Sequence, residues 1–402
     1  MDLKSGYPYW TVKNGLLASF PALSRDVTCD VAVIGAGITA ALIARELAQA
    51  GLDVIVLDKR DAGWGSTAAS TALIQYEVDP GLVGLARAVG ERNAVAVLKA
   101  CEASIGEIAS IAKDTPGSRF RSAESLYYAS WPWHARSVIE EGELRRRHGF
   151  GVDILDRADV AKRFGIATSA ALLTRVAGEL DPYAMALGIL RKLAHRGCGV
   201  FDRTEVKAIE PAPRHVILRT DRECSVRCGH AVVAAGYESQ SFLRSRVARN
   251  HSTYAIVTEP VRDLPPWARR TLLWESRHPY LYVRSADDGR LMVGGEDDLV
   301  DAPGKRDRAV ARKSKRLVGK LRKLLGREDI EIGFAWAGTF AETADGLPFF
   351  GPHSELGPRV HFAMAYGGNG IVYSAVGAGL IRRKIVRQSH PLARVLSFER
   401  LR

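Results

Sequence analysis

The sequence has few cysteines, and they form no pattern that would hold a fold together. Its 402 residues include five cysteines, Cys29, Cys101, Cys198, Cys224 and Cys228. An odd and scattered number is not typical of a disulfide framework. Cys224 and Cys228 are close in sequence, but no second pair and no histidine cluster completes a zinc site. We therefore expect reduced thiols, no metal centre and a cytoplasmic location.

Long apolar segments are also lacking. The region from Met1 to Pro21 mixes aromatic residues with Asp2, Lys4 and Lys13, and it contains no apolar stretch of signal-peptide length. The rest of the chain has no run of about 20 apolar residues, which a membrane-spanning helix requires. The composition, with 47% hydrophobic and 25% charged residues, is typical of a globular protein with two domains or one large domain.

The net charge is +12, and one segment carries much of it. Lys305 to Lys323 contains ten lysines and arginines and one aspartate. Val310, Leu317, Leu321 and Leu324 recur there at helical spacing, which predicts an amphipathic helix with a basic, solvated outer face. A nucleic-acid or membrane patch is the alternative interpretation. No zinc finger, RRM-like aromatic motif or KH loop accompanies the segment, so we expect no nucleic-acid partner.

The most informative stretch runs from Asp30 to Arg60. Its order is an apolar strand, a glycine-rich turn, a largely apolar helix, a glycine, a second apolar strand and an acidic residue: Val31–Ile34, Gly35–Ala40, Ala41–Ala50, Gly51, Val54–Leu57 and Asp58. This order and these lengths are typical of the βαβ unit that binds a dinucleotide. The context makes the motif far more specific than a glycine pattern alone.

Each residue of this motif has a physical role. Gly35 permits the tight turn from strand to helix, and Gly37 lets the backbone approach a pyrophosphate. Ala40 is small enough for the helix to pack closely on the strand. The amino terminus of the helix presents N–H groups and positive dipole to the phosphates. Asp58 is placed to accept hydrogen bonds from an adenosine ribose, so the motif predicts NAD or FAD.

The segment that follows favours FAD. Gly65 to Ala72, with the sequence GSTAASTA, consists of small residues and hydroxyls. It resembles the small-residue loop of the D-amino-acid-oxidase-like (DAO) FAD-dependent oxidoreductases, the family that includes glycine oxidase and sarcosine oxidase. In that family the loop covers the pyrophosphate and approaches the flavin. The resemblance therefore implies bound FAD.

Later segments resemble the same family, in the same order along the chain. They are Asp181-Pro182-Tyr183 at the start of a helix predicted to end near His195, Val206 at the place of a residue whose backbone meets the adenine, Ala231–Gly236, Trp336–Gly338, Asp345–Pro348 and Tyr366–Ile371. Asp181 suits the N-cap and Pro182 the first helical position. In the family, the last segment lies over the flavin pyrimidine and offers backbone amides at a helix amino terminus.

The motif and the resemblance together predict cofactor-binding residues spread over the whole chain. These are Gly35, Gly37, Ile38, Thr39, Asp58, Lys59, Gly65, Ser66, Thr67, Ser70, Thr71, Val206, Ala235, Gly236, Gly338, Gly367, Gly368, Asn369, Gly370 and Ile371. Some relatives link FAD covalently through a cysteine or a histidine. We expect non-covalent FAD, because Trp336 to Ile371 contains no cysteine and Gly65 to Ala72 contains no histidine.

The predicted fold class is α/β, with a Rossmann-like FAD-binding domain and a discontinuous α+β substrate domain built on an antiparallel sheet. The FAD-binding domain takes residues 1–80, 179–242 and 332–402, and the substrate domain takes residues 81–178 and 243–331. Tyr280–Arg284 and Arg290–Val293 alternate in polarity on either side of Asp287-Asp288-Gly289, which predicts a hairpin in the substrate domain.

The resemblance also implies a reaction, in which the flavin takes hydride from a carbon that bears an amine and water hydrolyses the resulting imine. We therefore predict an oxidase or dehydrogenase that acts on CH–NH donors, with an amine or a secondary or N-substituted amino acid as substrate. One alternative is a flavoprotein subunit of a dehydrogenase that passes electrons to a protein acceptor. Another is a flavoenzyme for a non-amine or nucleic-acid substrate. A reductase linked to NAD(P)H is disfavoured, because no second G-x-G-x-x-G follows a strand.

The resemblance also gives candidate substrate residues. In some relatives, an arginine shortly after the Trp-x-Gly segment pairs with the substrate carboxylate. The matching residue here is Phe340, which argues against a simple D-amino acid or glycine as substrate. Arg284 is a candidate carboxylate clamp, and it shares a strand face with Tyr280 and Tyr282, so all three point toward the flavin or away from it. Glu342 is a candidate proton acceptor if burial raises its pKa. A surface position for Arg284 and an exposed loop position for Glu342 are the alternatives.

Overall fold

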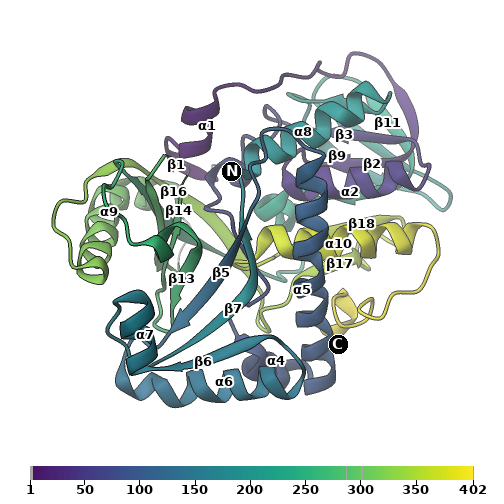
Figure 1. Ribbon diagram of the computed structural model, residues 1–402. Coiled ribbons are helices and arrows are strands. Elements are labelled where there is room, and N and C mark those ends of the chain that lie inside the picture. Colours follow the sequence, from purple (N-terminus) through teal and green to yellow (C-terminus); the bar gives the residue numbers. More distant parts are fainter. Residues whose placement is uncertain (1–2, 287, 300–301, 402) are drawn as a thin grey trace.

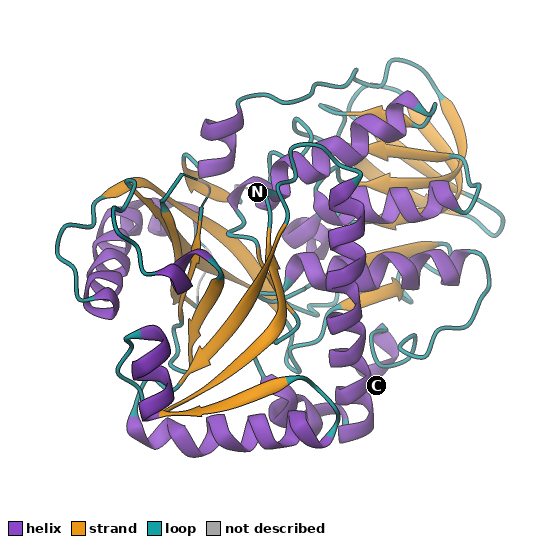
Figure 2. Ribbon diagram, in the orientation of Figure 1, coloured by secondary structure: helices purple, strands orange, loops and turns teal. Residues whose placement is uncertain are grey.

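The computed structural model describes residues 3–286, 288–299 and 302–401, so Asp287 of the predicted turn lies outside the described residues. Within these ranges the chain forms two β-sheets with helices beside and between them (Figure 1, Figure 2). No helix of the described ranges combines the length and apolar character needed to cross a membrane. The five cysteines are free thiols, and the described residues contain no group of three metal-binding side chains.

The smaller sheet contains the predicted dinucleotide motif. Its order is β17-β18-β11-β2-β3-β8, with β10 paired to β11 and β9 paired to β10. The strands are β2 (Val27–Ile34), β3 (Val54–Leu57), β8 (Gly199–Phe201), β9 (Val206–Pro211), β10 (Val216–Thr220), β11 (Ser225–Val233), β17 (Phe349–Pro352) and β18 (Val360–Met364). The pairs β18–β11, β11–β2, β2–β3 and β3–β8 are parallel. β2 therefore lies between β3, its successor in the motif, and β11, and such a switch point is where open α/β sheets bind ligands.

Helices cover one face of this sheet. They are α2 (Ile38–Gln49), α8 (Pro182–His195) and α10 (Gly370–Ile385), and α5 (Glu91–Lys113) packs against α10 and runs as a long rod through the middle of the molecule (Figure 1). The helix α8 begins as predicted, because the side chain of Asp181 accepts a hydrogen bond from Ala184 N at 2.9 Å and Pro182 takes the first helical position. Thr39 and Ser374 join α2 to α10 through a hydroxyl hydrogen bond of 2.7 Å.

The larger sheet has the order β1-β16-β12-β15-β14-β13-β5-β7-β4, and β6 pairs with β7. Its strands are β1 (Lys4–Gly6), β4 (Leu73–Gln75), β5 (Arg121–Tyr128), β6 (Val152–Asp156), β7 (Ala170–Glu179), β12 (Arg249–Thr258), β13 (Thr271–Glu275), β14 (Leu281–Ser285), β15 (Leu291–Asp298) and β16 (Ile332–Glu342). All neighbours along this order are antiparallel except β5 and β13. The predicted hairpin is present as β14 and β15.

The limits of the two sheets do not follow the predicted limits at residues 80 and 331. Three strands that were predicted to belong with the FAD-binding segments, β1, β4 and β16, pair in the larger sheet. The reason is that β16 pairs with β12 along nearly its whole length, from Ile332 to Glu342, and then carries β1 on its other edge. The predicted division into two domains stays a prediction.

The remaining helices surround the larger sheet. They are α1 (Tyr9–Asn14), α3 (Ser66–Ala69), α4 (Gly81–Val89), α6 (Ala135–Arg147), α7 (Arg157–Phe164) and α9 (Pro303–Leu325). The helix α9 contains the basic segment and lies on the outer face of the sheet (Figure 1). Leu317 and Leu321 are fully buried there and belong to one apolar cluster with Tyr254 and Ile256 of β12. Alternate residues of β12 therefore face away from α9, toward the interior between the sheets.

The expected solvated face of α9 needs a correction, because several of its cations point inward. Lys313 is buried, and its Nζ donates to Glu296 O at 2.6 Å and to Asp298 Oδ1 at 2.7 Å. Arg306 is also buried and donates to Thr339 Oγ1 at 2.7 Å. Lys320 lies 2.7 Å from Glu296 Oε1. Buried cations of this kind are found where carboxylate and carbonyl partners compensate their desolvation.

We expect Lys313→Ala to destabilise the protein by about 3 kcal/mol, because it leaves the buried carbonyl of Glu296 and the carboxylate of Asp298 without their cation. The measurement is chemical denaturation followed by circular dichroism. Lys315→Ala is the matched control, since Lys315 lies on the same helix but is exposed, and it should change the free energy of unfolding by less than about 0.5 kcal/mol. Equal effects of the two substitutions would contradict the inward docking of the α9 cations.

Candidate functional site

A cavity of about 480 Å³ lies between the two sheets. One end is formed by the carboxyl ends of β2, β3 and β11 and by the start of β9. The other end is formed by one face of the larger sheet, and the loop 65–72 and the start of α10 line the stretch between them. The cavity is therefore long, and it begins at the switch point of the smaller sheet.

The turn from β2 to α2 leaves no room for side chains at its glycines. Gly35 has a φ of 111°, and a Cβ atom there would overlap Ala234 O of the neighbouring strand turn. A Cβ atom on Gly37 would lie 2.8 Å from Thr67 Oγ1, which accepts a hydrogen bond from Ile38 N at 3.0 Å. The amino terminus of α2 and the loop 65–72 thus meet at a narrow cradle lined by backbone, as pyrophosphate binding requires.

Asp58 lies at the end of β3, where the motif predicts it. Its Oδ2 accepts a hydrogen bond from Ala36 N at 2.7 Å and its Oδ1 accepts one from Arg60 N at 2.8 Å. Burial raises the pKa of Asp58 to about 6, although these backbone hydrogen bonds act in the opposite direction. A carboxylate oxygen accepts more than one hydrogen bond, so Asp58 retains capacity for a ribose hydroxyl.

Cationic side chains gather at this end of the cavity. Lys59 Nζ lies 2.9 Å from Glu238 Oε1, and Arg60 Nη1 lies 2.8 Å from Glu238 Oε2. Burial opposes the ionisation of Glu238, but the hydrogen bonds from Arg60 and Lys59 dominate and hold its pKa at about 2. Lys207, on β9, also lines the cavity here. The dinucleotide end therefore offers cationic side chains to phosphates, and Glu238 and Glu205 pair with them in this structure.

Three donors hold the loop 65–72 in place between the sheets. Trp336 Nε1 donates to Ala69 O at 2.8 Å, and Trp10 Nε1 donates to Ser70 O at 2.7 Å. Arg284 Nη1 donates to Ala72 O at 3.3 Å. Ser66 Oγ lines the cavity and is buried without a hydrogen-bond partner among the described residues. The carbonyl groups of this loop are thus engaged, while a hydroxyl faces the cavity, which fits a cofactor with hydrogen-bonding groups.

The placement of Arg284 does not fit the predicted carboxylate clamp. It shares a strand face with Tyr280 and Tyr282, as expected, but it does not line the cavity. Its guanidinium is buried behind the loop 65–72, where Nη2 donates to Leu180 O at 3.2 Å and Nη1 lies 3.8 Å from Glu179 Oε2. The physical reason is that Ala72 O covers it, so Arg284 positions the loop and is separated from the cavity.

The start of α10 is fixed against β4 and the residues after it. Asn369 Nδ2 donates to Gln75 O at 3.2 Å and to Glu77 O at 2.6 Å. Gly368 N donates to Asp79 Oδ2 at 3.3 Å, and a Cβ atom on Gly368 would lie 3.1 Å from that oxygen. The glycine-rich segment therefore lets the backbone amides at the amino terminus of α10 lie close to the cavity.

All the predicted cofactor-binding residues line this one cavity. They come from β2, α2, β3, the loop 65–72, β9, the turn after β11, β16 and the start of α10. The fold thus gathers segments that are up to several hundred residues apart in sequence. The described residues that line the cavity include neither a cysteine nor a histidine. Their individual contacts with FAD stay a prediction.

The opposite end of the cavity is one face of the larger sheet. Gly338, Phe340 and Glu342 alternate along β16, and Thr253 lies opposite Gly338 on β12. The residues that complete this face are Asp297 of β15, Tyr280 and Tyr282 at β14, and Trp274 of β13. Because alternate residues of a strand point to one side, the same strands present their apolar residues to α9 and these residues to the cavity.

A β-bulge aims Asp297 into the cavity. Tyr254 pairs with Gly295 and Ser252 pairs with Asp298, so two residues of β15, Glu296 and Asp297, lie opposite one residue of β12. Glu296 has a φ of 57°, a left-handed conformation that is uncommon for a residue with a side chain. As a result Glu296 points to the cations of α9, whereas Asp297 points inward. Bulges commonly redirect side chains in this way beside functional sites.

Carboxyl groups and tyrosines at this end are electrostatically coupled. Burial, and then the negative charges of Asp79 and Glu342, raise the pKa of Asp297 to about 7, although a Thr253 hydrogen bond and Lys313 act in the opposite direction. Burial, and then the charge of Asp79, also raise the pKa of Glu342. Burial raises the pKa of Asp79 itself, despite the hydrogen bond from Gly368. Groups that lie in a cavity with shifted pKa values are candidates for proton transfer.

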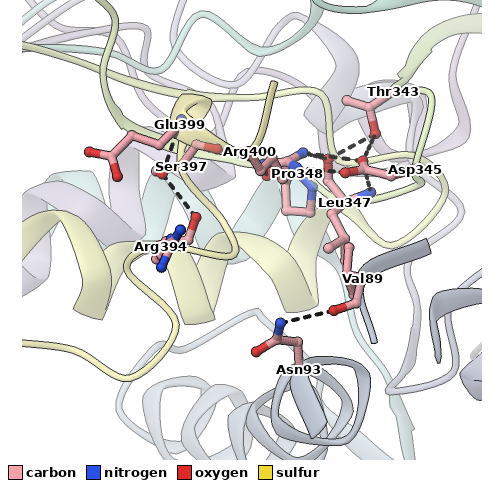
Figure 3. Close-up of polar contacts among 10 residues, drawn as sticks. All are labelled: Val89, Asn93, Thr343, Asp345, Leu347, Pro348, Arg394, Ser397, Glu399 and Arg400. Atoms are coloured by element: carbon pink, nitrogen blue, oxygen red, sulfur yellow. Dashed lines mark hydrogen bonds and ion pairs between the residues drawn. The ribbon is translucent and has the colours of Figure 1, made fainter. Parts of the chain in front are cut away.

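The loop that follows Glu342 is held by the carboxyl-terminal residues (Figure 3). Asp345 Oδ1 accepts hydrogen bonds from Thr343 Oγ1 at 3.0 Å and from Leu347 N at 3.1 Å, and Arg400 Nε donates to Asp345 Oδ2 at 2.7 Å. Burial opposes the ionisation of Asp345, but Arg400 lowers its pKa below the usual value. This ion pair fixes the end of the strand that carries Glu342.

The sequence analysis did not identify Asp79, Asp297 or Gln75 as site residues, although all three line the cavity. Asp79 and Gln75 belong to no motif. A signal for Asp297 was present in the sequence, because Gly294 and Gly295 precede it in a strand and glycine in a strand often marks a bulge. A Cβ atom on Gly294 would overlap the ring of Tyr282, so this glycine makes room for a cavity residue.

Comparison with known proteins agrees with this geometry. The family model described as FAD dependent oxidoreductase (DAO) matches residues 30–383. Among curated relatives, a glycine oxidase of Bacillus licheniformis is 27% identical over 85% of this chain and 89% of its own length. A gamma-glutamylputrescine oxidoreductase of Escherichia coli (strain K12) is 24% identical over 93% of this chain and 87% of its own length.

Solved structures show the same fold. The L-proline dehydrogenase of P. horikoshii superposes with a TM-score of 0.78 at 17% identity, covering 94% of this chain and 99% of that one. The glycine oxidase of Geobacillus kaustophilus gives a TM-score of 0.77 at 19% identity, covering 92% of this chain and 98% of that one. With a dinucleotide cradle at one end of the cavity and a family match over most of its length, the chain belongs to the DAO family of FAD-dependent oxidoreductases.

Proposed function

We propose that FAD lies along the cavity with its adenosine at Asp58 and Val206 and its pyrophosphate at the cradle of Gly35, Gly37 and the loop 65–72. The flavin then extends toward Gly338 and the start of α10. The narrow backbone contacts at the glycines, the cations near Glu238 and the unpartnered Ser66 Oγ support this orientation. Non-covalent attachment is supported by the absence of cysteine and histidine from the described lining.

We also propose that the enzyme oxidises a C–N bond of an amine or of a secondary or N-substituted amino acid. The observation that carries this is the end of the cavity beyond Gly338, where aromatic side chains and carboxylates meet the start of α10. When bound, FAD supplies the hydride acceptor, and dioxygen or another two-electron acceptor reoxidises it. The names of relatives, glycine oxidase and gamma-glutamylputrescine oxidoreductase, agree with a nitrogen-bearing substrate.

The protein residues position the substrate and move one proton. Asp297 takes a proton from the substrate ammonium, which leaves a neutral amine whose lone pair assists loss of hydride from the adjacent carbon. The C–H electron pair leaves with the hydride and a C=N bond forms, which gives an iminium. Water then adds to the iminium carbon, and a carbonyl product and ammonia or an amine are released. A pKa near 7 suits Asp297 to this role at neutral pH. Trp274, Tyr280 and Tyr282 exclude water from the reacting carbon.

Gly37→Ala should lower the affinity for FAD at least about tenfold, because its Cβ atom fills the cradle against Thr67. The ratio of flavin absorbance to protein absorbance after reconstitution and gel filtration measures this. Gly106→Ala is the control, since Gly106 is an exposed helix residue with nothing near its Cβ position, and it should retain full flavin content. Unchanged flavin content in Gly37→Ala would reject the proposed pyrophosphate site.

The pH dependence follows from Asp297, which must be ionised to accept a proton. Its raised pKa means that the active form is lost as the pH falls, so kcat/KM should decrease about tenfold per pH unit below about 7 and level off above it. Asp297→Asn should remove this inflection and lower kcat roughly 100-fold. Asp329→Asn, at an exposed position, should preserve the profile. An unchanged profile in Asp297→Asn would assign the proton to another group.

A further inference from the structure

We propose that the substrate is an aliphatic diamine or polyamine, in which a second cationic group takes the place that a carboxylate has in an amino acid. This inference rests on the proposed amine oxidation and narrows it to one substrate class. It follows from the distribution of charge, unpartnered acceptors and aromatic surface at the end of the cavity beyond Gly338.

The cations in the described cavity lining lie at one end, whereas acidic residues occur at both ends. The cationic lining residues, Lys59, Arg60 and Lys207, lie at the dinucleotide end. In the described part of the lining, the opposite end has Asp79, Asp297 and Glu342 and no lysine, arginine or histidine. A substrate carboxylate placed there would be desolvated beside like charges and would have no cation to pair with. A cationic substrate would instead lie beside carboxylates of opposite charge and could pair with them.

The positions where a carboxylate-binding arginine was sought do not supply one. Position 340 is a phenylalanine, and its ring lies 5.4 Å from the ring of His251. Arg284 is held behind the loop 65–72 by Ala72 O and Leu180 O. Neither candidate position therefore presents a guanidinium group to the cavity, which agrees with a substrate that has no carboxylate to bind.

Two buried acceptors in the cavity have no donor among the described residues. Gln75 is 8% exposed and lines the cavity, and its Oε1 has no hydrogen-bond partner. Asp297 Oδ1 is in the same condition. Unpartnered buried acceptors require a ligand that donates hydrogen bonds. An ammonium group has three donors and no acceptor, whereas a carboxylate has acceptors alone.

The carboxylates come from separate elements, so they can hold more than one cation. Asp297 projects from the bulge of β15, Glu342 ends β16, and Asp79 lies beside the start of α10. With Asp297 at the reacting nitrogen, Glu342 is left for a second ammonium; its side chain is 44% exposed, and its Oε2 lies 3.5 Å from His251 Nε2. A monoamine can pair with one of these carboxylates at a time, whereas a dication can pair with two. The raised pKa of each carboxyl group agrees with a need for cationic partners.

Aromatic side chains form the walls between these charges. Trp274, Tyr280, Tyr282 and Phe340 all line the cavity. Tyr127 stacks on Trp274 with a centroid distance of 4.1 Å and fixes the indole from behind. Aromatic faces bind methylene chains by apolar contact and bind ammonium groups by cation–π attraction. This combination fits a flexible alkyl chain that carries ammonium groups.

The test compares putrescine, n-butylamine and γ-aminobutyrate, which share one chain length and differ at the end remote from the reacting amine. Anaerobic reduction of the flavin in the holoenzyme gives the rates. We expect putrescine to exceed n-butylamine roughly 10- to 100-fold in the second-order rate constant, as an added charged hydrogen bond predicts. We expect γ-aminobutyrate to be the poorest of the three. Equal rates for putrescine and n-butylamine, or preference for γ-aminobutyrate, would overturn the inference.

Variants assign the effect to residues. Glu342→Gln should lower the preference for putrescine over n-butylamine about tenfold, and Phe340→Arg should shift the preference toward γ-aminobutyrate. Glu331→Gln is the matched control, because Glu331 is an exposed glutamate next to the same strand, and it should leave the preference unchanged. An undiminished preference in Glu342→Gln would overturn the assignment of the second cation to this carboxylate.

Binding separates failure of this inference from failure of the proposed reaction. Calorimetric titration of the holoenzyme with putrescine reports binding whether or not the flavin is reduced. Binding that Glu342→Gln weakens, without flavin reduction, would reject amine oxidation and support the dication site. Flavin reduction by amines with no preference for putrescine would support amine oxidation and reject the dication site. Absence of putrescine binding would overturn the inference outright.

Discussion

The position of the loop 65–72 between the two sheets is the constraint on which the rest of the site depends. This loop has no core of its own, and its carbonyl groups are held by the Trp10 and Trp336 indoles and by the Arg284 guanidinium. Because these donors come from the amino-terminal helix, β16 and β14, the loop ties the dinucleotide motif to the larger sheet. The alignment of the cofactor cradle with the substrate face therefore depends on a few charged or polar hydrogen bonds in a dry environment, where each is strong.

Much of the smaller sheet could be predicted from sequence because its physics is local. The alternation of apolar strand, glycine turn and apolar helix occupies Asp30 to Arg60 without interruption, and β3 has the predicted limits. The N-cap at Asp181 is likewise decided within a few residues, by a side chain that reaches the amide of Ala184. The remote segments that line the cavity were predicted from the family resemblance and not from this local pattern.

The substrate end could not be predicted in the same way, because pairing between distant strands decides it. Arg284 shares a strand face with Tyr282, yet Ala72 O, more than two hundred residues away, determines that it is covered. The pairing of β16 with β12, across the predicted limit at residue 331, is likewise decided between distant strands. The inward cations of α9 depend on Glu296 and Asp298, whose direction the sequence pattern does not reveal. The register between strands that are distant in sequence is hard to predict from a single sequence, unlike local helix or strand propensity.

The bulge in β15 has a consequence for how this site can diverge. Glu296 and Asp297 are adjacent carboxylates whose pKa values shift in opposite directions. Burial acts to raise the pKa of Glu296, but the cations of α9 lower it below the usual value, whereas burial raises the pKa of Asp297. Deleting Asp297 would restore regular alternation and leave Glu296 opposite Thr253 on the cavity side, so that the longer side chain would enter the cavity. The loss of this single codon would therefore alter the depth and acidity of the pocket together, while the strands, the helix and the cofactor cradle stayed in place.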